Sequence, residues 1–140
     1  MKRVMMLLLV VSLLWSFAIP AFATVPNDTV VQPRYTYIKT HITNLTIDET
    51  TGIATSKASC YAVGGNTVEI ECKLQRYNGS SWTTIKTWTA SGTNYASVNK
   101  DWAVYSGYTY RVYAAYRIRS TAGNLLESTT SSKTCIYPTN

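Results

Sequence analysis

The sequence predicts an all-β protein in which a signal peptide is followed by one two-layer antiparallel β-sandwich of about seven strands. Segments from Tyr35 onward alternate apolar and polar side chains with a period of two, the spacing of a half-buried strand. Short turns rich in glycine and asparagine separate these segments. No segment carries apolar residues at helical spacing over ten or more positions. Together these observations favour stacked sheets over helices.

The first 23 residues have the features of a cleavable export signal. Lys2 and Arg3 provide a positive start, residues 4–19 are almost entirely apolar, and Ala21 and Ala23 are the small residues that a signal peptidase requires. The apolar run is too short to span a bilayer comfortably. We therefore expect a secreted, extracellular protein with no membrane attachment after cleavage.

The rest of the chain is expected to form a flexible leader, 24–34, and a single sandwich domain, 35–140. The leader contains two prolines and few apolar residues, whereas the domain is long enough to bury its own core. Both phenylalanines and all three methionines lie in the signal segment, so tyrosine and tryptophan must supply the large core side chains. The abundant serine and threonine favour strands.

The strands are expected in the following order. The first covers 35–47, with a break near Asn44 where the alternation slips, and a turn at 48–52 leads to the second strand at 53–62. The remaining strands are expected at 67–77, 82–89, 95–98 with 102–104, 108–119 and 127–137. The turns between them are expected at 64–66, 78–79, 91–94 and 123–124.

Two of these strands give a testable register. If 67–77 lies antiparallel beside 108–119, Glu69 falls opposite Arg117 and Gln75 falls opposite Arg111 on the outer face. Cross-strand pairs of this kind are an ordinary stabilising feature of sheets. They compete with a second interpretation in which Arg111, Arg117 and Arg119 form a basic binding patch.

A glycine-containing corner at 106–107 precedes the strand that begins with Tyr108. Immunoglobulin-like and fibronectin type III-like sandwiches place a tyrosine at this point, and its hydroxyl bonds to upstream backbone. We assign this tyrosine-corner role to Tyr110, or failing that to Tyr108. The feature favours that class of sandwich.

Cys60 and Cys72 occupy core-facing positions on consecutive strands that should lie in opposite sheets. They could form a disulfide across the core or remain free, buried thiols. Free thiols are favoured because the register is off by about three residues, roughly 10 Å, and a disulfide needs closer α-carbons. Cys135 lies near the far end of the last strand and should reach neither.

The sequence offers little for catalysis or metal binding. Asp48 and Glu49 are adjacent in a turn, where they are poorly placed to act together on one bond. His41 is the only histidine and has no catalytic partner nearby in the pattern. The cysteine spacings fit no zinc motif. We therefore expect a protein that is not an enzyme and that has no metal or cofactor.

The best candidates for ligand binding are aromatic, because tyrosine and tryptophan combine a flat apolar face with a hydrogen-bonding edge. Tyr77, Trp82 and Trp88 flank one expected hairpin, and Tyr113 should lie nearby on the outer face. The competing interpretation is that these rings belong to the core. On that interpretation Trp82 or Trp88 would be buried, together with Trp102.

Residues 74–88, LQRYNGSSWTTIKTW, and the later segment 107–112, GYTYRV, resemble small secreted proteins of Gram-positive gut bacteria. The likeness covers most of the expected mature chain. Those proteins are similar to fibronectin type III or immunoglobulin-like sandwiches and have no assigned function. The resemblance implies an exported, stand-alone domain, and it carries no catalytic or binding residues over to positions in this chain.

Charge and export narrow the expected partners. Without Lys2 and Arg3 the formal charge falls from +6 to +4, since 11 basic residues remain against 7 acidic ones. This charge is too mild for a nucleic-acid-binding protein, although it would favour adhesion to anionic cell-wall polymer. We expect a non-catalytic recognition or interaction domain at the cell envelope, whose partner is a glycan, a cell-wall polymer or another surface protein. Two alternatives are a dedicated glycan- or wall-polymer-binding module that uses its tyrosines and tryptophans, and a small secreted antibacterial toxin.

Overall fold

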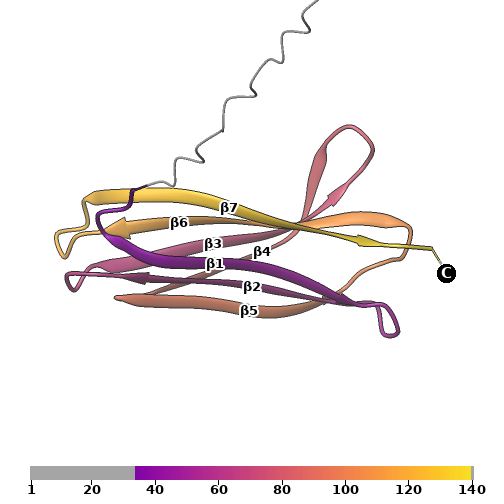
Figure 1. Ribbon diagram of the computed structural model, residues 1–140, viewed down its shortest axis with the longest axis horizontal. Helices are drawn as coiled ribbons and strands as arrows, with labels where there is room; N and C mark the ends of the chain where they lie inside the picture. The colour runs from indigo at the N-terminus through magenta and orange to yellow at the C-terminus, as the bar shows by residue number, and fades with distance from the viewer. Residues whose placement is uncertain (1–33, 140) are drawn as a thin grey trace, which may run out of the picture. The chain divides into compact units, whose positions relative to one another are not determined.

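The computed structural model describes residues 34–139, which form seven strands in two antiparallel sheets (Figure 1). The expected signal peptide and residues 24–33 of the expected leader lie outside the described residues. No helix among the described residues is long and apolar enough to cross a membrane. The strands are β1 (Ile38–Asp48), β2 (Ile53–Ala62), β3 (Thr67–Tyr77), β4 (Trp82–Thr93), β5 (Tyr95–Ala103), β6 (Tyr108–Arg119) and β7 (Leu125–Tyr137).

The two sheets confirm the expected all-β sandwich. One contains the strands in the order β1-β2-β5, and the other contains them in the order β4-β3-β6-β7. In β3, alternate residues from Val68 to Leu74 are buried, while the residues between them face outward. The expected register of β3 against β6 is also confirmed, because Glu69 pairs with Arg117 and Gln75 pairs with Arg111.

The core lies between the inner faces of the sheets. Tyr110 and Tyr116 are its largest fully buried side chains, which follows from the absence of phenylalanine and methionine after residue 22. Around them pack small and branched residues, chiefly Leu45, Ala54, Ala58, Cys60, Val68, Ile70, Cys72, Leu74, Val98, Val112, Ala114 and Ile118.

Tyr116 connects the two sheets through its hydroxyl. It lies on β6, and its Oη donates to the carbonyl oxygen of Ile42 on β1 at 2.7 Å and contacts Oγ1 of Thr43 at 2.6 Å. Thr43 faces this hydroxyl, so the side chain of Thr43 lies on the inner side of β1 although it is polar. Ile42 faces outward and is 58% exposed.

The outward position of Ile42 and the inward position of Thr43 explain why the break expected near Asn44 was wrong. An outward isoleucine followed by an inward threonine looks like a register slip near Asn44 when only the sequence is read. The irregularity of β1 lies instead between Ile38 and Thr40, and the strand runs regularly from there to Asp48.

A carboxylate on β7 holds the start of β1 in place. Glu127 faces the inner side of its sheet, opposite Ile118. Its two carboxylate oxygens accept backbone N–H bonds from Thr36, Tyr37 and Ile38 at 2.9, 2.8 and 2.7 Å. The edge strand of one sheet is thereby tied to the edge strand of the other.

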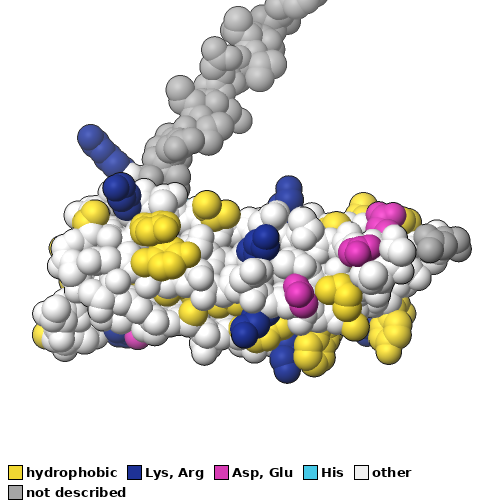
Figure 2. Space-filling model, turned by 90° about the horizontal axis from the view of Figure 1, so that it is seen from below, with side chains coloured by type: hydrophobic (Ala, Val, Ile, Leu, Met, Phe, Trp, Pro, Cys, Tyr) yellow, Lys and Arg dark blue, Asp and Glu magenta, His cyan; other side chains and the backbone are white. Residues whose placement is uncertain are grey.

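The margins of both sheets carry lysines at unusual positions. Lys86 on β4 and Lys133 on β7 pair with the inner-facing Leu74 and Val112, and Lys100 on β5 pairs with the buried Ser56. On β1, Lys39 lies at the bulge between Ile38 and Thr40. All four edge strands therefore have a lysine at a core-facing or bulged position. The view toward the β5 margin shows Lys and Arg side chains among small groups of hydrophobic ones (Figure 2).

Ser56 gives a first stability prediction. Its side chain is fully buried, and its hydroxyl has no hydrogen-bond partner among the described residues. Ser56→Ala removes an unsatisfied polar atom, so we expect the free energy of unfolding to rise by about 1 kcal/mol. Urea unfolding of the variant and of Ser59→Ala, on the outer face, measures the difference. A loss of stability specific to Ser56→Ala would contradict the prediction.

Candidate functional site

Three aromatic rings and one guanidinium gather on the outer face of the β4-β3-β6-β7 sheet. Arg111 lies with its Cζ 4.3 Å from the ring centroid of Trp82 and 5.5 Å from that of Tyr113. The ring centroids of Tyr77 and Trp82 are 5.2 Å apart. We refer to Tyr77, Trp82, Arg111 and Tyr113 as the aromatic–arginine cluster.

A polar row across three strands fixes the position of Arg111. Its Nε donates to Oε1 of Gln75 at 2.7 Å, and Nε2 of Gln75 donates to Oγ1 of Thr84 at 2.9 Å. No hydrogen bond joins the two terminal nitrogens of Arg111 to the other residues between 34 and 139. The cluster is thus held in place while part of the cation stays available for a ligand.

The β3–β4 hairpin carries Tyr77 and Trp82, and it curls away from the sheet (Figure 1). Gly79 takes the positive φ of 97° at its tip. The side chain of Asn78 stabilises the turn, because its Oδ1 accepts hydrogen bonds from the backbone N–H groups of Ser80 and Ser81. The hydroxyl of Tyr77 donates to the carbonyl oxygen of Gly79 at 2.9 Å, which orients the ring beside Trp82.

Trp88 does not belong to the cluster. A register shift between Leu74 and Gln75 leaves Ile85 unpaired, so Trp82 and Trp88 face opposite sides of β4 although six positions separate them. Trp88 pairs with the inner-facing Cys72 and packs partly buried against the core. A ligand on the outer face therefore cannot contact it together with the other three rings.

Trp102 departs from the expected burial. It is 41% exposed at the β5 margin, and Nζ of Lys86 lies 4.3 Å from its ring centroid. The expectation was wrong because the ring sits where the sheets end, between two edge strands. At this margin the ring of Trp102 is covered by Lys86 and not by core residues of the opposite sheet.

Tyr110 ties the β5–β6 loop to the core. Its hydroxyl donates to the carbonyl oxygen of Tyr105 at 2.9 Å and accepts the backbone N–H of the same residue at 3.1 Å. The side chain is buried, and this burial raises the pKa of the hydroxyl. These contacts support the loop and leave the side chain out of reach of a ligand.

The thiols of Cys60 and Cys72 are free and fully buried. Burial raises the pKa of each to about 11, so both stay protonated and unreactive near neutral pH. The sequence left open either a disulfide or free thiols, and in the structure the thiols are free. Cys135 is also free and is half-buried on β7.

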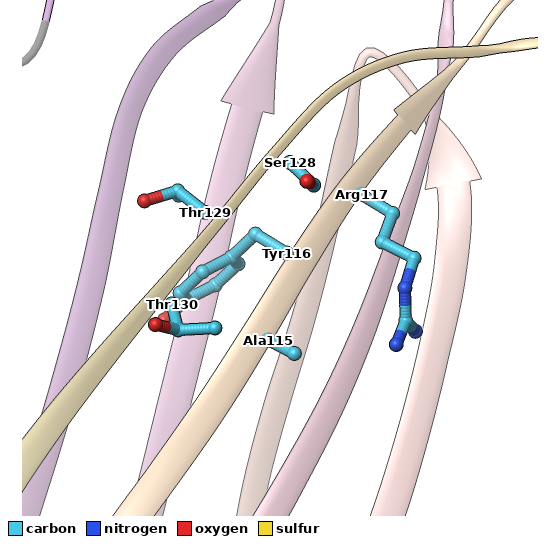
Figure 3. Close-up of a pocket in the computed structure, with 6 residues that line it drawn as sticks. All are labelled: Ala115, Tyr116, Arg117, Ser128, Thr129 and Thr130. Atoms are coloured by element: carbon cyan, nitrogen blue, oxygen red, sulfur yellow. The ribbon is translucent and has the colours of Figure 1, made fainter.

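A shallow hollow of about 410 Å³ adjoins the aromatic–arginine cluster along β6 and β7. Ala115 forms its floor, because its small side chain lies between larger neighbours on the outer face. Arg117 and Tyr116 extend to opposite sides of β6 (Figure 3). The lining consists of Ala115, Tyr116, Arg117, Ser128, Thr129 and Thr130.

The ion pairs on the outer face include neither Arg111 nor Arg117. Glu71 pairs with Lys73 at 2.6 Å, and the lysine bond lowers the pKa of the Glu71 carboxyl. Glu69 lies opposite Arg117 in the register, yet its ion pair is with Arg119 at 3.0 Å. Among the described residues, Arg117 makes no ion pair and no side-chain hydrogen bond.

Asp48 and His41 make contacts that support the fold. The Asp48 carboxylate accepts backbone N–H bonds from Thr50 and Thr51, which lower its pKa. His41 lies between the rings of Tyr35 and Tyr116, at 5.5 and 5.1 Å between centroids. Within residues 34–139, no three His, Cys, Asp or Glu side chains are grouped to hold a metal ion.

No protein-family model, curated protein or solved structure matches this chain. Sequence reasoning singled out Tyr77, Trp82 and Tyr113 but missed the central place of Arg111. The expected pairing of Gln75 with Arg111 was the available signal, because it already put the arginine on the face of these rings. The hollow beside Arg117 had no comparable signal.

Proposed function

We propose that this chain is an exported immunoglobulin-like or fibronectin type III-like sandwich that acts as a non-catalytic recognition domain at the cell envelope. The aromatic–arginine cluster is the observation that carries this proposal. It presents rings and a cation at the surface in a fixed arrangement, which lowers the entropic cost of binding.

Independent features support the class of sandwich. The three- and four-stranded sheets, and the bond from Tyr110 back to the loop before β6, are features of such domains. The residues at 1–23 support export, since they combine a positive start, an apolar run and small residues at a cleavage position. A net positive chain would be attracted to an envelope rich in anionic polymers.

The cluster fits a mixed aromatic and ionic contact better than a stack of neutral sugars. Arg111 covers one face of Trp82. A neutral sugar on that face would have to displace a guanidinium that is also hydrogen-bonded to Gln75. A glycan module that relies on Trp82 alone is therefore the weaker candidate, and no contact among the described residues favours the toxin.

Binding to isolated cell envelopes tests the proposal. The full chain is expressed in an exporting Gram-positive host, purified from the medium and incubated with washed walls. We expect Trp82→Ala to weaken binding about tenfold, because the ring anchors both Tyr77 and Arg111.

Trp102→Ala is the matched control. Trp102 is also a surface tryptophan with a cation 4.3 Å from its ring centroid, and we expect its removal to leave binding unchanged. An equal loss in the two variants, or no binding by the unaltered chain to any envelope, would count against the proposed recognition function.

A further inference from the structure

The outward face of β7 carries a continuous row of hydroxyls. Every outward position along the middle of the strand is a serine or threonine, and all four are exposed. At strand spacing the row extends over about 20 Å. Its members are Ser128, Thr130, Ser132 and Thr134.

Arginines lie at both ends of the matching row on β6. Thr134 pairs with Arg111 and Ser128 pairs with Arg117, so the backbone positions of the two arginines are six residues apart on one face, about 20 Å along the strand. The guanidinium of Arg111 extends across β3 to Gln75 and Trp82. Between them lie the ring of Tyr113 and the methyl group of Ala115. We refer to these two adjacent rows as the β6–β7 groove.

Both arginines retain unpaired donors. Arg111 uses only its Nε, for Gln75, and Arg117 has no side-chain hydrogen bond or ion pair among residues 34–139. The neighbouring carboxylates of Glu69 and Glu71 are each paired with another cation. Their charge is thus partly neutralised, and an anion on the groove is not strongly repelled.

The hollow lies within this groove and has room for one ring or one polyol unit. Ala115, Arg117, Ser128 and Thr130 belong to its lining, and Arg117 extends from β6 on the side away from β7 (Figure 3). A volume of about 410 Å³ is within the usual range for small-ligand sites. The two rows continue past the hollow to Tyr113 and Ser132, so their length suits a chain better than a compact molecule.

From this arrangement we infer that the β6–β7 groove binds a linear anionic, polyhydroxylated chain, such as a polyol phosphate or an acidic polysaccharide. Guanidinium groups donate and never accept, so the ligand must supply acceptor oxygens beside Arg117, and the positive charge favours anionic ones. Serine and threonine hydroxyls donate and accept, so they match ligand hydroxyls in between. The inference rests on the proposed recognition function and specifies its ligand class.

Titration calorimetry with defined polymers tests the inference. Poly(glycerol phosphate) and polygalacturonate carry acidic groups and hydroxyls, dextran carries hydroxyls alone, and polyglutamate carries acidic groups alone. We expect binding of one or both of the first two, and binding at least tenfold weaker for the last two. The polymer that binds more tightly shows whether the acid is a phosphate or a carboxylate.

Four variants locate the site. We expect Arg117→Gln to weaken polymer binding about tenfold and Thr130→Val, which keeps the side-chain shape, to weaken it several-fold. Ala115→Leu fills the hollow and should weaken binding to a similar extent. Lys57→Gln is the control, because it removes one exposed positive charge from the outward side of β2 in the other sheet, and binding should stay within twofold.

The outcomes separate this inference from the proposed function. Polyglutamate binding as tightly as the polyhydroxylated acids would overturn the ligand class. Arg117→Gln and Ala115→Leu binding like the unaltered chain would overturn the site, even if envelope binding still depended on Trp82. Polymer binding through Arg117 without any envelope binding would contradict the proposed function while upholding the groove.

Discussion

Replacement of Tyr116 by alanine is expected to lower the free energy of unfolding by about 4 kcal/mol, and replacement by phenylalanine by about 2 kcal/mol. Alanine leaves a cavity where one of the two buried tyrosine rings of β6 now lies. Phenylalanine keeps the ring but removes the hydroxyl that bonds Ile42 on the opposite sheet at 2.7 Å. Urea unfolding measures both values.

The same hydroxyl predicts a pH effect. Burial raises the pKa of Tyr116 to about 12, above its value of about 10 in the unfolded chain. Its contribution to stability is therefore complete below pH 10 and declines as the pH rises toward 12. This part of the alkaline loss should be missing in Tyr116→Phe.

Tyr113→Phe is the matched control for Tyr116→Phe. Tyr113 lies three positions earlier on β6 but faces outward, so its hydroxyl is expected to contribute less than about 0.5 kcal/mol to stability. Equal losses of stability in the two phenylalanine variants would show that the inter-sheet bond contributes nothing of its own.

Replacement of Glu127 by glutamine is expected to lower the free energy of unfolding by about 2 kcal/mol at pH 7. The carboxylate accepts three backbone N–H bonds from the start of β1, and an amide group turns one acceptor into a donor. Glu49→Gln, in the β1–β2 turn, is the control, because its carboxylate makes no hydrogen bond among the described residues.

The stability lost in Glu127→Gln should become smaller as the pH falls. Burial tends to raise the pKa of Glu127, but the N–H bonds from Thr36, Ile38 and Tyr37 outweigh it and hold the pKa below its ordinary value. The stabilisation is then present above about pH 4.3 and is lost as the pH falls below it. The difference between the unaltered chain and Glu127→Gln should narrow in acid. A constant difference from pH 7 to pH 3 would contradict this account.

The strands that could be predicted most accurately are those whose inner positions are uniformly apolar or small. β2, β3 and β6 have the bounds expected from the sequence, because each alternates cleanly and ends at a residue suited to a turn. β1 begins later than expected, since Glu127 organises residues 36–38, and a contact from a distant strand leaves no local pattern.

The candidate site could be predicted only in part. Alternation placed Tyr77, Trp82 and Tyr113 near one hairpin, and the expected register placed Gln75 opposite Arg111. The bulge at Ile85 was not visible, because it arises from how two strands pair rather than from either strand alone. For the same reason Trp88 was grouped with Trp82. Trp102 was expected inside for another reason, because the pattern does not show that its ring lies at the margin of the sheets.

The lysines at the four sheet margins bear on how this protein behaves at high concentration. A second copy that aligned with an open margin would bring a charged amine against the interior of the joined sheets, which is a recognised barrier to self-association and fibril growth. We therefore expect the chain to resist edge-to-edge pairing at high concentration. Partners that add a strand face the same barrier, so contacts with other molecules are directed to the broad surfaces of the sheets.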